Sequence, residues 1–178
     1  MIITPEIRQE WEAVGYRIRE IRKSKDMTLE EMESKSKIST ADICKFENGR
    51  STTSINYTLF LRNEFGASFD WIYEGERFLK EHKPKNVRCK TLDPIAIGLR
   101  LKKIREKLGL NRVEFGKVTG VYIFDLEKGE RIPRIETAKK IKQAIGKPLD
   151  WIYFGDEIVV PKSVAKAKKQ EKKQLQHS

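Results

Sequence analysis

Cysteine and histidine are scarce in this chain of 178 residues: there are two of each, at no spacing that suits a metal site. The two cysteines, Cys44 and Cys89, also form no disulfide framework. No apolar run approaches the length of about 18 residues that a membrane span needs, and the N-terminus lacks the pattern of a signal peptide. The sequence predicts a soluble, cytoplasmic protein with no metal, no cofactor and no membrane contact.

Enzyme signatures are missing as well. The chain has no glycine-rich phosphate loop after a strand and no acid and base paired at a convincing spacing, so we expect neither catalysis nor a small-molecule substrate. Alternating apolar runs with hairpin turns, which are typical of strands, are also absent. The sequence therefore predicts an all-α protein.

Positive charge is abundant but unevenly placed. The net charge is +11, and it divides into −2 for residues 1–75, +3 for 76–94, +5 for 95–158 and +5 for 159–178. A basic surface of this size favours a polyanionic partner such as nucleic acid. The first part of the chain does not share that basic character.

The chain contains an internal repeat. In the second part of each copy a displacement of 80 residues aligns matched pairs: Ile43 and Ile123, Glu47 and Glu127, Asp70 and Asp150, Trp71 and Trp151. In the first part the displacement is 83, as for Gly15 and Gly98 or Arg22 and Arg105. The second copy therefore lacks three residues between its counterparts of Ile38 and Ile43.

Each copy is predicted to be helical. Apolar residues from Ile7 to Ile21 recur at steps of three and four, behind a capping Thr4. Further start signals at Thr28, Ser39 and Asn111 each place a capping residue three positions before an acid. We predict copy one over residues 1–75, a linker over 76–93, copy two over 94–158 and a disordered basic tail over 159–178.

An ordered set of motifs occurs in both copies. Copy one has Gly15-Tyr-Arg-Ile-Arg-Glu-Ile-Arg, Ile38-Ser-Thr-Ala-Asp-Ile-Cys-Lys-Phe-Glu-Asn-Gly49 and Asp70-Trp-Ile, and copy two has Gly98-Leu-Arg-Leu-Lys-Lys-Ile-Arg, Leu126-Glu-Lys-Gly-Glu-Arg-Ile-Pro133 and Asp150-Trp-Ile. The set resembles the lambda-repressor-like (Cro/CI, XRE) helix-turn-helix family. The resemblance implies two tandem five-helix domains, in which a reader helix enters the DNA major groove.

The resemblance implies a DNA-binding surface on copy one. The base-facing positions of the family fall on Thr40, Ala41, Cys44 and Lys45 of a reader over residues 40–47. The positions that hold the DNA backbone fall on Thr28, Asn48, Arg50 and Ser51. Ser39 is expected to cap the reader and could also touch a phosphate. A solvated lysine at Lys45 and an ordinary thiol at Cys44 remain open alternatives.

Copy two is predicted to have a shortened reader. Three missing residues remove nearly one turn of helix, at the end that normally enters the groove. The exposed Tyr122 and Phe124 would then suit a contact with the linker, with copy one or with a second subunit. Basic residues in this copy could still grip the DNA backbone, and we expect Arg112, Lys128 and Arg131 to do so.

These features together predict a sequence-specific transcriptional regulator that binds double-stranded DNA. The resemblance implies a repressor of bacterial or phage genes, with the basic tail either as a DNA-backbone arm or as a solubilising segment. The alternative is a protein-interaction module, such as an antitoxin or adaptor, that uses the helix-turn-helix copies as scaffold. A monomer that uses both copies and a homodimer both remain open.

Overall fold

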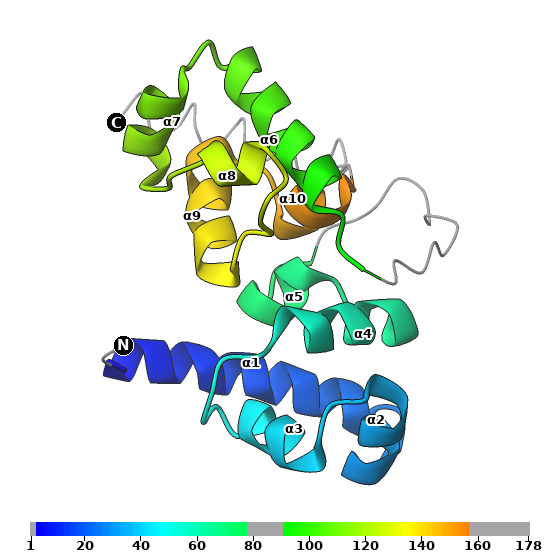
Figure 1. The fold of residues 1–178 in the computed structure, drawn as a ribbon. Coiled ribbons are helices and arrows are strands. Elements are labelled where there is room, and N and C mark those ends of the chain that lie inside the picture. Colours follow the sequence, from blue (N-terminus) through cyan, green and yellow to red (C-terminus); the bar gives the residue numbers. More distant parts are fainter. Residues whose placement is uncertain (1–2, 78–90, 157–178) are drawn as a thin grey trace, which may run out of the picture.

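Every regular element in the described part of the chain is an α-helix, as predicted (Figure 1). The computed structural model describes residues 3–77 and 91–156, so most of the predicted linker and all of the predicted tail lie outside it. Copy one contains α1 (Pro5–Lys23), α2 (Leu29–Ser36), α3 (Thr40–Glu47), α4 (Ile55–Phe65) and α5 (Phe69–Glu74). Copy two contains α6 (Pro94–Lys107), α7 (Arg112–Thr119), α8 (Phe124–Glu127), α9 (Ile135–Ile145) and α10 (Leu149–Phe154). In the described ranges, no helix combines the length and the apolar character that crossing a bilayer requires.

The predicted capping residues set the helix starts. Thr4 accepts a hydrogen bond from the Ile7 amide at the start of α1. Thr28 and Asn111 each form a reciprocal capping box with the glutamate three residues later, at the starts of α2 and α7. The same local chemistry therefore begins corresponding helices in both copies.

Half-buried arginines hold corresponding helices together in each copy. Arg17 of α1 donates to the carbonyl oxygens of Ile72 and Tyr73 at 2.8 and 3.1 Å, at the end of α5. Arg100 of α6 makes the same contact at the end of α10. The carbonyl groups at a helix end lack partners within the helix, so these arginines satisfy them and fix the first helix against the last.

Two glycines allow close approach of the first helix to the third. A Cβ atom on Gly15 would lie 2.4 Å from the carbonyl oxygen of Phe46, and one on Gly98 would lie 2.3 Å from that of Leu126. Both distances are far below van der Waals contact, and both obstacles are backbone atoms that cannot rotate away. The matched Gly15 and Gly98 of the repeat therefore mark the packing of α1 on α3 and of α6 on α8.

Replacing Gly98 by alanine should destabilise copy two by about 1 to 3 kcal/mol, because the added methyl group forces the backbone of α8 away from α6. The control is Gly116→Ala in α7, where the Cβ atom would lie 3.4 Å from its nearest neighbour. Alanine favours a helix by up to about 1 kcal/mol over glycine, so this variant should be neutral or more stable. Urea unfolding followed by circular dichroism measures both, and equal stability of the two variants would contradict the packing argument.

Candidate nucleic-acid interface

Two helices and a tight turn form the predicted helix-turn-helix of copy one. The helix α2 ends at Ser36, and Lys37 takes a left-handed conformation with a φ of 62°. Ser39 then caps α3, so Lys37 to Ser39 form the turn at the predicted place. This short connection fixes the angle at which α3 leaves α2.

The helix α3 presents one apolar face inward and one polar face outward. Ile43 and Phe46 are buried, while Ala41 and Lys45 are exposed and Cys44 is half-buried. Thr40 begins the helix, where its amide donates to the Glu33 carboxylate at 3.0 Å. The structure thus brings the predicted base-facing residues together on one side of α3.

The exposed end of α3 has a small polar network. The Ser39 hydroxyl accepts from the Asp42 amide at 3.2 Å and donates to the Asp42 carboxylate at 2.9 Å. Lys45 donates to the same carboxylate at 2.9 Å, and its hydrogen bond, followed by that of Ser39, lowers the pKa of Asp42. Exposed pairs of this kind contribute little free energy, so Lys45 can exchange Asp42 for a phosphate or a base at small cost.

The loop after α3 contains the predicted backbone-contacting residues. Asn48 ends the helix: its side-chain amide donates to the carbonyl oxygen of Cys44 at 2.8 Å and accepts from Arg19 at 2.6 Å. Arg50 is exposed and Ser51 is half-buried. Thr28, at the start of α2, is exposed and occupied in its capping box. Asn48 and Thr28 therefore have structural partners already.

Sequence reasoning missed Arg19. It lies on α1, 35% exposed in its side chain, and its bond to Asn48 places a guanidinium group beside the end of α3. The available signal was its position in the Arg17, Arg19 and Arg22 series, in which the two neighbours are used for internal contacts. Arg19 also lies 3.5 Å from the buried Glu47 carboxylate, so only part of its positive charge is available to the surface that α3 and Arg50 present.

Copy two has a much shorter equivalent of this surface. The helix α8 contains four residues, whereas α3 contains eight, at the place where the sequence of copy two lacks three residues. The residue before α8, Ile123, provides no side-chain cap. The N-terminal turn that would enter a groove is therefore absent from copy two.

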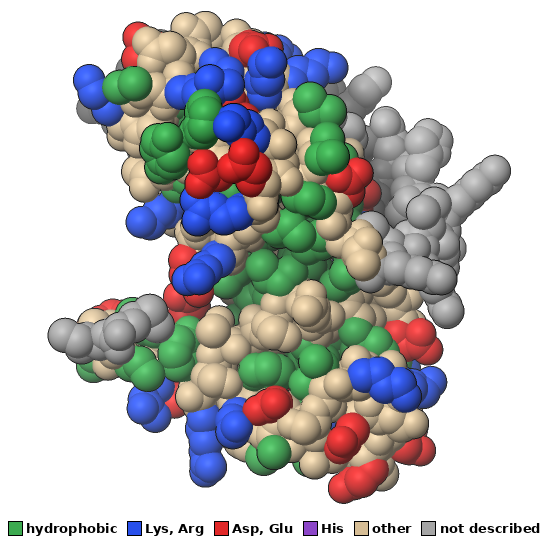
Figure 2. All heavy atoms as spheres, viewed as in Figure 1, with side chains coloured by type: hydrophobic (Ala, Val, Ile, Leu, Met, Phe, Trp, Pro, Cys, Tyr) green, Lys and Arg blue, Asp and Glu red, His purple; other side chains and the backbone are tan. Residues whose placement is uncertain are grey.

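The basic residues predicted to grip DNA in copy two are all paired with acids. Arg112 donates to Glu127 at 2.7 Å, Lys128 lies 3.4 Å from Glu130, and Arg131 forms an ion pair with Asp125. Figure 2 shows basic and acidic side chains intermixed over this copy instead of one continuous basic surface. Lys128 and Arg131 stand in exposed pairs and can exchange their acids for phosphates at small cost, as Lys45 can, whereas Arg112 also neutralises the buried Glu127.

The expected contact through Tyr122 and Phe124 does not join the two copies. Tyr122 is 75% exposed, and its ring centroid lies 6.3 Å from that of Phe124. Phe124 is half-buried because the guanidinium group of Arg112 and the ammonium group of Lys128 lie over its ring, at 5.1 and 4.3 Å from the centroid. The helices α5 and α10 make the contact between the copies instead.

Comparison with protein families agrees with this geometry. A model described as a helix-turn-helix domain matches residues 15–77, and a second one, described as helix-turn-helix, matches residues 101–152. The chain belongs to the lambda-repressor-like helix-turn-helix family, as two tandem copies. Neither the curated proteins nor the solved structures gave a match. Helix-turn-helix domains of this type support a general role in DNA-binding regulation.

Two arginines, the buried Arg105 and the exposed Arg112, should make Glu127 important for the stability of copy two. Burial alone would raise its pKa, but the hydrogen bonds from Arg105 and Arg112 outweigh burial and lower it below the ordinary value of 4.5. Ionised Glu127 therefore stabilises the fold at pH values above 4.5, and this stabilisation is lost as the pH falls through the lowered pKa of Glu127.

We expect Glu127→Gln to lower the free energy of unfolding by about 3 kcal/mol at pH 7, because it leaves Arg105 buried without its counter-charge. The variant should also lose part of its dependence on pH in the acid range. The control is Glu130→Gln, which affects an exposed pair and should change stability by less than about 1 kcal/mol. Unfolding curves between pH 3 and 7 test this, and similar losses for both variants would contradict it.

Proposed function

We propose that the chain is a sequence-specific DNA-binding transcriptional repressor that acts in the cytoplasm of a bacterial or phage-infected cell. Copy one reads base edges through α3, and copy two supports the complex through contacts with the DNA backbone. A protein bound over a promoter excludes other proteins from the same DNA, and this exclusion is the proposed basis of repression.

The observation that carries the proposal is the outward face of α3. Ala41 and Lys45 are exposed on α3, and Arg19, bonded to Asn48, and Arg50, in the loop after the helix, bring positive charge near its C-terminal end. A major groove about 12 Å wide admits one such helix, while guanidinium groups near that end can meet DNA phosphates. Arg50 and Arg19 would therefore position the reader, and Lys45, Ala41, Thr40 and Cys44 would face the bases.

A second candidate function, a protein-interaction module, is favoured by the surface of copy two. Its exposed apolar side chains include Ile95, Val113 and Val118, where the repeat puts Glu12, Glu30 and Lys35 in copy one. Exposed apolar groups of this kind suit a protein partner better than a polyanion. Under this alternative, Tyr122 and Phe124 belong to the partner surface. Selection of bound duplexes from a random DNA pool separates the two functions, since an interaction module recovers no sequence motif.

We expect Lys45→Ala to weaken binding to a selected duplex by about 1 to 3 kcal/mol if the ammonium group contacts a base, and Arg50→Ala to weaken it less, as loss of a phosphate contact does. Both residues are exposed, so the helical content should stay unchanged. Titrations by fluorescence anisotropy measure the affinities.

The matched control for these two variants is Lys35→Ala. This variant removes the same charge from copy one, but the ammonium group of Lys35 lies 3.5 Å from Glu64 and so is directed at α4. It should bind DNA like the parent. Parental affinity in both the Lys45 and Arg50 variants would rule out α3 as the reader.

Removal of residues 161–178 should lower the affinity for all duplexes alike, because a lysine-rich segment can meet phosphates without reading bases. If this segment and copy two neutralise ~6 phosphates, the parent should show a slope of log affinity against log salt near −5, and the shortened chain a flatter one. Affinities measured between 50 and about 200 mM salt give both slopes. Equal slopes would make the segment a solubilising tail.

A further inference from the structure

The contact between the copies is reciprocal. Arg62 of α4 lies 3.4 Å from Asp150 and 3.0 Å from Asp156 in copy two. In the other direction, Lys142 of α9 donates to Asp70 at 2.8 Å and to Glu76 in copy one. The residues of these two groups of contacts correspond through the repeat at an offset of 80 positions: Arg62 and Lys142, Asp70 and Asp150, Glu76 and Asp156. The interface is therefore pseudo-two-fold, like that of a symmetric dimer, but it lies within one chain.

Aromatic side chains fill the centre of this interface. Phe69 of α5 is fully buried, with its ring centroid 5.1 Å from that of Tyr153 and 5.0 Å from that of Phe154. The guanidinium group of Arg62 lies 3.7 Å from the centroid of the Phe154 ring. Buried rings in edge-to-face contact hold two surfaces in one orientation, so the copies are docked and not merely tethered.

Copy one also completes a helix of copy two. Ser68 caps α5, but its counterpart before α10 is Pro148, which provides no side-chain cap. The buried Asp70 carboxylate takes its place and accepts from the amides of Leu149 and Asp150, both at 2.8 Å. The start of α10 thus depends on a residue of the other copy.

Lys142 neutralises the acidic side of the interface. Its ammonium group binds Asp70, Glu74 and Glu76, the three carboxylates that otherwise lie close enough to share a metal ion. Burial alone would lower the pKa of Lys142, but the hydrogen bonds to these three carboxylates raise it above its ordinary value. Lys142 therefore stays charged at neutral pH and prevents repulsion among the carboxylates.

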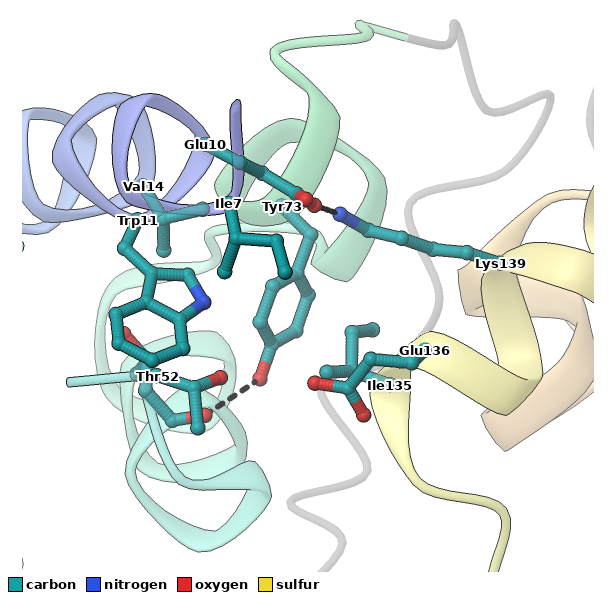
Figure 3. Close-up of a pocket in the computed structure, with 10 residues that line it drawn as sticks. Ile7, Glu10, Trp11, Val14, Thr52, Tyr73, Ile135, Glu136 and Lys139 are labelled. Carbon is teal, nitrogen blue, oxygen red and sulfur yellow. Dashed lines mark hydrogen bonds and ion pairs between the residues drawn. The ribbon is translucent and has the colours of Figure 1, made fainter. Parts of the chain in front are cut away.

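A second contact lies farther along the same interface. Figure 3 shows Lys139 of α9 reaching across to an ion pair with Glu10 of α1. Beside this pair, Trp11 and Ile135 from the two copies line a cavity of about 80 Å³. Copy two is thus held against copy one at α1 as well as at α5, which restrains rotation about the α5–α10 contact.

We infer that one chain is a complete DNA-binding unit, whose target is a single asymmetric duplex site with base-specific sequence under α3 and only backbone contacts under copy two. This inference rests on the proposed function. A two-fold interface closes on itself, so the α5 and α10 faces used here are no longer open to a second chain. Figure 1 shows α3 and α8 in different copies, with α1 and α5 between them in this view. The inference requires one duplex to reach both helices, and the footprint described next tests this.

The first test uses the parent chain and a duplex selected from a random DNA pool. We expect one chain per duplex by sedimentation, and a footprint in which the base-specific motif lies at one end. Protection should continue to one side for about one helical turn, roughly 10 base pairs, without base preference. Shortening the duplex on that side should lower the affinity about tenfold, because the backbone contacts of copy two are lost.

The second test loosens the docking. In Lys142→Ala, unneutralised carboxylates should weaken the interface, so that the long and shortened duplexes bind within about twofold of each other. The matched control is Lys140→Ala, an exposed lysine on the same helix, which should keep the tenfold difference. A Lys142 variant that keeps the full difference would overturn the role of the docking.

The possible failures are distinguishable. Recovery of no duplex at all would contradict the proposed DNA-binding function itself. A palindromic motif with two chains per duplex would leave that function standing and overturn the single-chain inference. Equal affinity of the parent for the long and shortened duplexes would also overturn it, and this measurement needs no variant.

Discussion

The buried carboxylate of Asp70 is the interaction on which the arrangement of the two copies depends. A carboxylate removed from water costs several kcal/mol unless charges and hydrogen bonds replace the lost hydration. Asp70 has both: two amides at the start of α10 and the ammonium group of Lys142. Because these partners come from copy two, undocking the copies would expose an incomplete helix and break three bonds at once. The docked arrangement is therefore strongly preferred over a loose tether.

The two copies share a scaffold and differ in the surface that the scaffold displays. Gly15 and Gly98 allow the same helix crossing, and Arg22 and Arg105 pair with the corresponding glutamates that end α3 and α8. The difference in chain length between the matched segments lies at the turn, where three residues are missing from copy two. A deletion at that point shortens a surface helix without disturbing the core, because Ile123 remains buried where Ile43 is buried in copy one. Recognition can thus be lost from a domain whose fold persists.

Local signals made much of the fold predictable. The caps at Thr28 and Asn111 act over three residues, and the shortened reader followed from a count of aligned positions. The partners of Arg62 were not predictable in this way, because they lie 88 and 94 residues away and depend on how the copies dock. The repeat did contain a hint, since one basic and two acidic positions of copy one recur in copy two at an offset of 80, but only the docked structure shows that they face each other. The partial burial of Phe124 was not predictable for the same reason, because it depends on two cations from neighbouring segments.

The net charge of each copy is a poor guide to which copy presents the better candidate for a DNA-reading surface. Residues 1–75 have a net charge of −2 and residues 95–158 one of +5, a contrast that favours DNA binding by copy two when the sequence is considered alone. In the structure, Lys139 and Lys142 of copy two bind acidic side chains of copy one. Part of the charge difference therefore joins the two copies, and other cations of copy two pair within it. The arginines beside α3, the exposed Arg50 and the half-buried Arg19, make the nominally acidic copy the better candidate for the DNA-reading surface, since charge acts through its position more than through its sum.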